Sequence, residues 1–291
     1  MKILLIGKTG QLGSSLLQLP SEHIWHAPGR DELDIESVDS CRIAIEKYKP
    51  DVVINTAAFH NVPLCESEPE RALAVNCIAV KRLARLCNAA GVRFVTFSSD
   101  YVFAGNVNIP YSENANTAPL QMYGISRLAG EHAALSQAPE HTIVIRTCGL
   151  YGMTGANSKG GNFVDSRIRD ALELASFEMG NDQTVTPTSA KDLAKAVIKL
   201  IEHPNCEVGV YHLVNEGQCT WYEFSCKIVE LMNLKVKISP VDRKGLSGEM
   251  RRPLYSVLAN TKAKALGVSL PNWQEALAEY INNKHAVRNV N

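Results

Sequence analysis

Residues 2–13 read KILLIGKTGQLG, an apolar run followed by three glycines at a spacing of three, Gly7, Gly10 and Gly13. The run is typical of a short buried strand, and a helix is predicted to begin at Gln11. Glycine permits a tight turn and a close approach of a pyrophosphate to the backbone, while the helix start offers free N–H groups to it. This strand–turn–helix frame predicts a dinucleotide-binding site; the alternative is a purely structural turn.

Strand-like and helix-like segments alternate as far as Gly152. Further strands are predicted at 23–28, 51–58, 92–99 and 141–152, and helices at 37–48, 70–91 and 120–136. The strands are apolar nearly throughout, as expected of strands buried on both faces, and their alternation with helices is typical of a parallel sheet. We therefore predict an α/β fold with a doubly wound parallel sheet of the Rossmann type.

After residue 152 this alternation ends. A stretch rich in glycine, asparagine and serine predicts a loop at 153–162; helices are predicted at 163–174, 189–203, 221–233 and 272–283, and a strand at 208–217. We expect residues 1–150 to form a dinucleotide-binding domain, to which residues 185–216 return. Residues 151–184 and 217–291 are expected to form a smaller C-terminal substrate-binding domain.

The composition excludes several classes of protein. The 291 residues are 45% hydrophobic and 21% charged with a formal net charge of 0, as in a soluble globular protein. Without a basic excess to neutralise phosphates, a nucleic-acid partner is not expected. The eight cysteines contain no CxxC pair and no metal-ligand spacing, so most are interpreted as core residues and no metal is expected. No apolar stretch reaches the ~20 residues of a membrane helix, and the first apolar run is too short for a signal peptide; we expect a cytoplasmic monomer or homodimer.

The second predicted strand leads into PGRDELDI, which carries the charged candidates for the adenosine end of a dinucleotide. Arg30 could bind a 2′-phosphate, and Asp31 or Asp34 could bind a ribose or the adenine; the alternative is a solvated charged loop. The arginine favours NADPH, with NADH as the other candidate. Small residues at 56–58, where the third strand ends, would let a cofactor lie across the sheet, although tight helix packing would need them too.

The fourth predicted strand ends in Ser98, Ser99 and Asp100, and the helix after it contains YGISR close to its start. A hydroxyl at this strand end can bind a carbonyl oxygen that gains negative charge during hydride transfer. A serine there is otherwise a helix cap, and YGISR alone is compatible with an exposed helix face. Arg127 lies one helical turn after Tyr123, where a cation favours the phenolate, so the pair indicates a proton donor with its charged neighbour.

The glycine turn, the strand-end serine and the Tyr-x-x-x-basic pattern resemble the extended short-chain dehydrogenases/reductases. More closely, the blocks GKTGQLG, PDVVINTAAF, SSDYVF, NFV, DQTVTPT and RRPLYSVL resemble the dTDP-4-dehydrorhamnose reductase family, from residue 1 to about residue 280. This resemblance implies an oxidoreductase of dTDP-rhamnose biosynthesis that uses NADPH or NADH. It would reduce the C4 ketone of a deoxysugar nucleotide, converting dTDP-4-dehydro-L-rhamnose to dTDP-L-rhamnose.

The same resemblance implies roles for individual residues. Tyr123 would protonate the new alkoxide, Ser99 would hold the carbonyl oxygen, and Arg127 would stand where the family has lysine. The residues expected to contact the cofactor are Gly7, Thr9, Gly10, Gln11, Leu12, Arg30, Asp34, Ile35, Ala57, Ala58, Phe59, Tyr123 and Arg127. The residues expected to contact the substrate are His60, Ser99, Asp100, Tyr101, Asn162 and Arg252.

Three positions depart from the family pattern. Arg127 keeps the charge of the lysine that it replaces, but its planar fork differs in geometry from an ammonium group. Gly149 stands where the family commonly has a substrate-facing tryptophan, and His60 stands where it usually has threonine. These departures leave two alternatives open. One is a reductase or epimerase of a different sugar nucleotide, and the other is a non-catalytic dinucleotide-binding regulatory subunit on the same fold.

Overall fold

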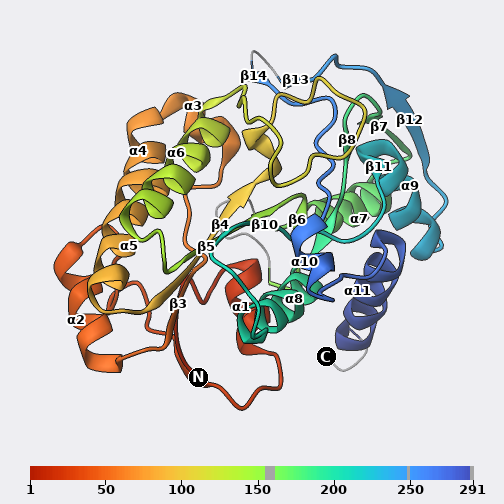
Figure 1. Ribbon diagram of the computed structural model, residues 1–291. Helices are drawn as coiled ribbons and strands as arrows, with labels where there is room; N and C mark the ends of the chain where they lie inside the picture. Colours follow the sequence, from red (N-terminus) through yellow and green to blue (C-terminus); the bar gives the residue numbers. More distant parts are fainter. Residues whose placement is uncertain (155–160, 248–249, 289–291) are drawn as a thin grey trace.

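The structure of the protein is a computed structural model that describes residues 1–154, 161–247 and 250–288 (Figure 1). Its centre is a six-stranded parallel sheet with the strand order β10-β5-β4-β3-β1-β2. The order reverses between β1 and β3, and in such sheets a crevice opens at the carboxyl ends of the two strands. The strands are β1 Lys2–Ile6, β2 Ile24–His26, β3 Val52–Asn55, β4 Arg93–Ser99, β5 Thr142–Thr147 and β10 Gly209–His212.

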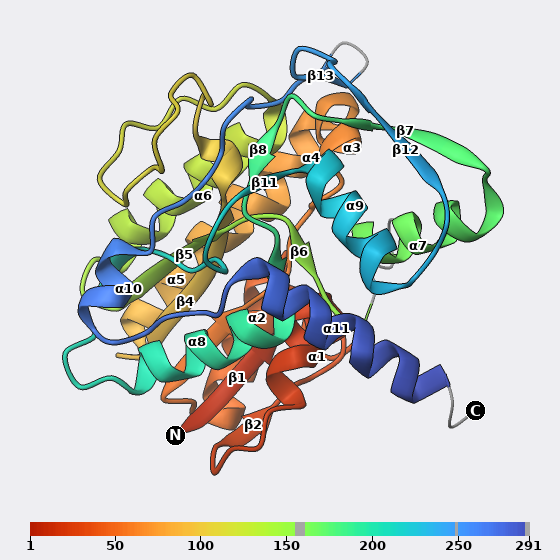
Figure 2. The same cartoon turned by 90° about the vertical axis from the view of Figure 1, so that its right-hand side faces the viewer.

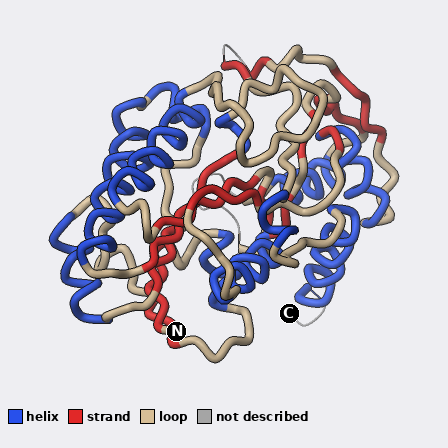
Figure 3. The backbone as a smooth tube through the Cα atoms, in the orientation of Figure 1, coloured by secondary structure: helices blue, strands red, loops and turns tan. Residues whose placement is uncertain are grey.

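Helices cover both faces of this sheet (Figure 3). Successive residues of β1 point to opposite faces: Ile3 and Leu5 belong to one buried cluster, and Leu4 belongs to the other. The first cluster includes residues of α1 and α8, and the second includes residues of α2, α5 and α6. The predicted doubly wound α/β fold is therefore confirmed. These helices are α1 Gln11–Leu17, α2 Val38–Tyr48, α5 Val80–Ala89, α6 Met122–Gln137 and α8 Ala190–Glu202.

The helix predicted over 70–91 is present from Pro69 to Ala89, and a π-helical segment lies within it. This segment directs the buried side chain of Asn76 at the loop after β3. Its Nδ2 donates to the carbonyl oxygen of Phe59 at 2.8 Å and to Oγ of Ser126 at 3.0 Å, and its Oδ1 accepts from the N–H of Phe59 at 2.9 Å. One side chain thereby ties three elements together. The three are the π-helix η1 Ala74–Ala79, the loop after β3, and α6. The short helices α3 Val62–Ser67 and α4 Pro69–Leu73 precede η1 in the chain.

The strand predicted over 141–152 is also divided. β5 ends at Thr147, and Gly149 has a φ of 53°, a left-handed conformation that glycine adopts at little cost. This turn takes the chain out of the main sheet. The next two residues form the short strand β6, Leu150–Tyr151, which pairs in parallel with β9, Thr188–Ser189, in a separate two-stranded sheet.

The rest of the chain builds a smaller group of elements beside the main sheet (Figure 2). Its helices α7, α9 and α11 share a buried cluster that contains Tyr151, Phe224 and Trp273. The helices predicted after residue 152 are confirmed, and α8 and β10 return to the main sheet, but the domain boundaries stay a prediction. The loop predicted at 153–162 falls largely outside the described residues. The elements of the smaller group are α7 Phe163–Glu173, β7 Ser176–Gly180, β8 Thr184–Val185, β11 Cys219–Thr220, α9 Trp221–Leu231, β12 Lys237–Val241, β13 Leu246–Ser247, β14 Met250–Arg251 and α11 Trp273–Arg288. The short helix α10 Thr261–Ala265 instead contacts β10, and its Ala263 belongs to the buried cluster of the main sheet.

None of the helices in the described part of the chain is both long enough and apolar enough to span a membrane.

Candidate active site

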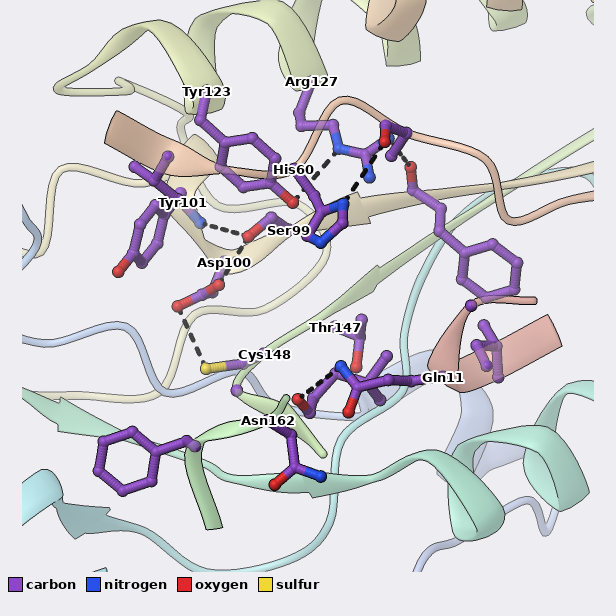
Figure 4. A pocket seen from close by; sticks show the side chains of 18 of the residues that line it. Gln11, His60, Ser99, Asp100, Tyr101, Tyr123, Arg127, Thr147, Cys148 and Asn162 are labelled. Carbon is purple, nitrogen blue, oxygen red and sulfur yellow. Dashed lines mark hydrogen bonds between the residues drawn. The ribbon is translucent and has the colours of Figure 1, made fainter. Parts of the chain in front are cut away.

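A cavity of about 650 Å³ lies where β4 and β5 end (Figure 4). Its walls come from both groups of elements. Ser99 ends β4, and Tyr123 and Arg127 extend from α6. The smaller group contributes Phe163 and Trp221, the first residues of α7 and α9. The fold therefore brings the serine and the tyrosine–arginine pair into one cavity.

A second cavity, of about 370 Å³, adjoins the first at the glycine turn. It is bounded by the residues after β1, β2 and β3, which surround the point where the strand order reverses. Residues common to the walls of both cavities are Thr9, Gly10, Thr56, Ala58 and His60.

Two glycines of the turn have no room for a side chain. A Cβ on Gly13 would lie 2.2 Å from the carbonyl oxygen of Gly7, and a Cβ on Gly7 would lie 2.5 Å from Oγ1 of Thr56. Gly7 also has a φ of 90°. Gly10 faces both cavities, and nothing lies closer than 3.5 Å to its missing Cβ, so its backbone is open to a ligand. The glycine spacing is therefore required by the local geometry as well as by ligand access.

The smaller cavity contains the residues predicted for the adenosine end of the cofactor. Arg30, Asp34 and Ile35 come from the segment after β2, and Ala57 and Phe59 from the segment after β3. Asp31, the alternative to Asp34, does not line the wall.

Sequence reasoning missed three further charged residues in this cavity, Lys8, Glu36 and Arg71. Arg71 reaches it from α4, where it forms a salt bridge with Glu36. Nothing in the local sequence distinguishes Arg71 from other surface arginines, because its position depends on how α4 packs beside the sheet.

A glycine also places the tyrosine at the start of α6. The helix begins after Gln121, whose side chain accepts the N–H of Gly124 at 2.7 Å. A Cβ on Gly124 would lie 2.1 Å from the carbonyl oxygen of Tyr101, so only glycine allows this approach to the 3-10 helix η2, Asp100–Val102. The approach brings the ring of Tyr123 edge-on to that of Tyr101, with centroids 6.0 Å apart.

Arg127 points at the hydroxyl of Tyr123 (Figure 4). Its Nε donates to Oη of Tyr123 at 3.4 Å, and its Nη1 donates to the carbonyl oxygen of Phe97 at 3.2 Å. Arg127 is only 9% exposed, so a carbonyl of β4 holds the guanidinium in place and little water screens its charge. Such a cation stabilises negative charge on the phenol oxygen when the hydroxyl gives up its proton.

Ser99 lies beside a buried carboxyl group. Its Oγ donates to Oδ1 of Asp100 at 2.7 Å and accepts the N–H of Tyr101 at 3.2 Å. Sγ of Cys148 donates to the other carboxyl oxygen at 3.1 Å. Burial raises the pKa of Asp100, and its polar neighbours Ser256, Ser99 and Cys148 oppose that rise.

Of the residues predicted to contact a substrate, His60, Ser99, Asp100, Tyr101 and Asn162 line the larger cavity. The Asn162 side chain caps α7 and donates to the carbonyl oxygen of Gly152 at 2.8 Å, so it also holds this wall together.

Arg252 lines neither cavity. It is close enough to Tyr101 for its charge to lower the pKa of that phenol, although burial has the larger effect and raises this pKa. A direct contact between Arg252 and a substrate stays a prediction.

Comparison with known proteins identifies the family. A family model described as the RmlD substrate binding domain matches residues 1–286. The chain belongs to the RmlD family. It is 35% identical to the spore coat polysaccharide biosynthesis protein SpsK of Bacillus subtilis, over 97% of this chain and 98% of SpsK. It is 32% identical to the dTDP-4-dehydrorhamnose reductase of Escherichia coli strain K12, over 97% of each chain.

Solved structures of RmlD-type proteins share the fold. The dTDP-4-dehydrorhamnose reductase of Bacillus anthracis, solved in complex with NADP, matches with a TM-score of 0.91 and 30% identity over 97% of this chain and 99% of that one. A Clostridium acetobutylicum dTDP-4-dehydrorhamnose reductase matches with a TM-score of 0.90 and 33% identity, over 98% of this chain and 100% of that one. The resemblance seen in the sequence motifs is therefore confirmed.

Three buried polar side-chain atoms of this RmlD family member indicate whether a dinucleotide fits the site. Oε1 of Gln11, Oγ of Ser98 and Oγ1 of Thr147 are buried without a hydrogen-bond partner within the described part of the chain, and all three residues line the larger cavity. Unsatisfied buried polar atoms cost about 1–3 kcal/mol each, so a polar ligand group there would be favourable. Together with the open backbone at Gly10, these atoms fit a cofactor that extends from one cavity into the other.

The RmlD-type site also contains residues that no sequence motif indicated. Thr147 ends β5 and Cys148 follows it. Trp221 begins α9, with its ring 4.5 Å, centroid to centroid, from that of Phe163. Cys148 lay in a strand predicted to continue to residue 152, and no pattern connected Trp221 with residues so far away in the sequence. In the described residues, no group of three or more His, Cys, Asp or Glu side chains is arranged to hold a metal ion.

Proposed function

We propose that the protein is an NADPH-dependent reductase of the C4 ketone of a dTDP-linked deoxysugar, with dTDP-4-dehydro-L-rhamnose as the first candidate substrate. One observation carries this proposal: the hydroxyl of Tyr123, the guanidinium of Arg127 and the hydroxyl of Ser99 meet in the cavity next to the glycine turn. The relatives named dTDP-4-dehydrorhamnose reductases support the substrate class.

The chain holds the residues that this chemistry needs. When bound, the cofactor supplies the hydride to C4. Ser99 binds the carbonyl oxygen, whose negative charge grows as the hydride arrives. Tyr123 then gives its proton to that oxygen, and Arg127, held by the carbonyl of Phe97, stabilises the phenolate left behind.

The cofactor would lie with its diphosphate over Gly10 and its adenosine in the smaller cavity. Arg30 and Arg71 both line that cavity and would favour the 2′-phosphate that distinguishes NADPH from NADH. Glu36 already pairs with Arg71, which leaves Arg30 as the principal candidate for this contact. Arg30→Ala should raise the KM for NADPH at least tenfold while leaving the KM for NADH nearly unchanged, and equal effects on both cofactors would refute this assignment.

The experiment that tests the function is NADPH oxidation, followed by absorbance, on addition of dTDP-4-dehydro-L-rhamnose. Turnover is expected with this substrate. Absence of turnover with saturating NADPH and a panel of 4-keto sugar nucleotides would refute the proposal, and tight NADPH binding in the same samples would then favour a regulatory subunit.

A second candidate is a reductase or epimerase of a different sugar nucleotide. The similarity to SpsK, a spore coat polysaccharide protein, favours this candidate. Gly149 favours it too, because a Cβ at that position would lie 3.1 Å from Cα of Pro187 and 3.3 Å from the ring of Trp221. A larger side chain at position 149 would therefore displace the cavity wall. A thermal-shift screen across dTDP-, UDP- and GDP-sugars separates the two candidates, because each predicts the largest stabilisation by its own nucleotide.

A further inference from the structure

The hydroxyl of Ser99 has a single proton, and the proposed mechanism needs that proton to point at the substrate. An oxygen that stabilises a growing negative charge must donate a hydrogen bond to it. In the structure, however, Oγ of Ser99 donates to Oδ1 of Asp100 at 2.7 Å. An ionised Asp100 can only accept hydrogen bonds, so it would compete with the substrate for this proton.

The surroundings of Asp100 disfavour a negative charge. The residue is 3% exposed, and its neighbours are hydroxyl and thiol groups, namely Ser99, Cys148 and Ser256. Within the described residues, no lysine, arginine or histidine forms a salt bridge with it. A buried carboxylate without a cation is costly, and such a group usually takes up a proton instead.

The titratable and charged groups around this carboxyl come from several elements. Cys148 comes from the turn after β5, Tyr101 from η2, Tyr123 from α6 and Arg252 from the segment after β14. Cys148, Tyr123 and Arg252 act electrostatically on the Tyr101 phenol, as Asp100 itself does. Of these groups only Arg252 carries a positive charge, and it lowers the pKa of the Tyr101 phenol, although burial has the larger effect and raises it.

We propose that Asp100 acts as a neutral carboxylic acid that donates its proton to Oγ of Ser99, and so frees the Ser99 hydroxyl to donate to the carbonyl oxygen of the substrate. This role rests on the proposed reductase function. It makes Asp100 a positioning residue, because it acts through Ser99.

The neutral form accounts for the hydrogen bonds of the carboxyl group with both Ser99 and Cys148. The acid proton on Oδ1 points to Oγ of Ser99, and Oδ2 accepts the thiol of Cys148. Oγ of Ser99 then accepts two hydrogen bonds, from Asp100 and from the N–H of Tyr101, and its own proton is left for the cavity. The ionised form instead holds that proton and leaves a buried charge unpaired. Burial also raises the pKa of this carboxyl group, which agrees with the neutral form.

The first test compares two substitutions at this position. Asp100→Asn copies the neutral acid, because its NH₂ can donate to Ser99 and its oxygen can accept from Cys148. It is expected to keep kcat within about threefold of the wild type, whereas Asp100→Ala is expected to lose at least tenfold. The control is Asp39→Asn, at a carboxylate whose side chain is 80% exposed on α2. An Asp100→Asn variant as inactive as Asp100→Ala, with an unchanged melting temperature and an unchanged Kd for NADPH, would overturn the proposal.

The second test reads the proton directly and does not depend on turnover. The infrared difference spectrum between wild type and Asp100→Asn at pH 7 should contain the carbonyl stretch of one protonated carboxyl group. Carboxylate bands alone would overturn the proposal even if the enzyme is active. If the wild type reduces none of the sugar nucleotides tried, the proposed function fails, while the infrared result still decides the protonation state.

Discussion

Replacing Arg127 by methionine removes the charge beside Tyr123 while keeping a long side chain. Nε of Arg127 lies 3.4 Å from Oη of Tyr123, and the arginine is buried. Two unit charges at that separation attract by about 5 kcal/mol at an effective dielectric constant of ~20. The guanidinium spreads its charge over three nitrogens and the transition state carries only part of the phenolate charge, so we expect a loss of about 2–3 kcal/mol. That corresponds to a decrease in kcat on the order of 100-fold.

The assay is NADPH oxidation at saturating cofactor and sugar nucleotide, so that kcat reports the proton-transfer site and not the affinity for either ligand. Arg127→Lys keeps the charge and should keep or raise kcat. Arg42→Met, at an exposed arginine of α2, is the matched control and should be unchanged. An Arg127→Met variant within threefold of the wild type would refute the electrostatic reasoning. A large loss in Arg127→Lys would instead show that the site depends on the arginine fork that reaches Phe97.

Three further outcomes are expected. Tyr123→Phe should abolish turnover without changing the Kd for NADPH measured by fluorescence; residual activity above about 1% would exclude Tyr123 as the main proton donor. Gly13→Ala would place a methyl group 2.2 Å from the carbonyl oxygen of Gly7. It should therefore lower the melting temperature and weaken NADPH binding at least tenfold. Unchanged binding would contradict the inference that the turn has no room for a side chain at Gly13. Burial and the charge of Arg146 lower the pKa of His212 from 6.5 to about 3. Between these pH values the unfolded chain binds one proton more than the folded protein, so the free energy of unfolding should fall as the pH drops from 6.5 to about 3. In urea titrations, the free energy of unfolding of the wild type should change by about 1 kcal/mol per pH unit, and that of His212→Gln by less. Equal changes in the two proteins would contradict a buried neutral histidine.

The parts of the site that the sequence predicts are those set by local chemistry. The glycine turn follows from the need for close backbone contacts around Gly7 and Gly13. Ser99 and the residues after β3 follow from a general property of parallel sheets, whose strands end at one edge. Tyr123 and Arg127 follow from helical periodicity, since residues four apart share a helix face.

The parts that could not be predicted depend on packing between distant segments. A π-helical segment has almost the same apolar pattern as an α-helix, so the position of Asn76 became evident only from its hydrogen bonds to Phe59. Trp221 reaches the cavity because α9 packs on α7, and Arg71 reaches the other cavity because of the position of α4. The surroundings of Asp100, the hydrogen-bond partner of Ser99, also include a residue from a distant segment, Cys148 in the turn after β5.

The place of β10 in the sheet has a consequence for how the protein is made. β10 pairs in parallel with β5, yet Gly209 is synthesised long after Thr147, with α7, β7 and α8 in between. A nascent chain therefore carries an unpaired strand edge at β5 for roughly several seconds at ribosomal rates. An open edge of this kind is a template for pairing with other chains. Aggregation should therefore be most sensitive to the speed of translation between these two strands, and a fragment that stops before Gly209 would keep the open edge permanently.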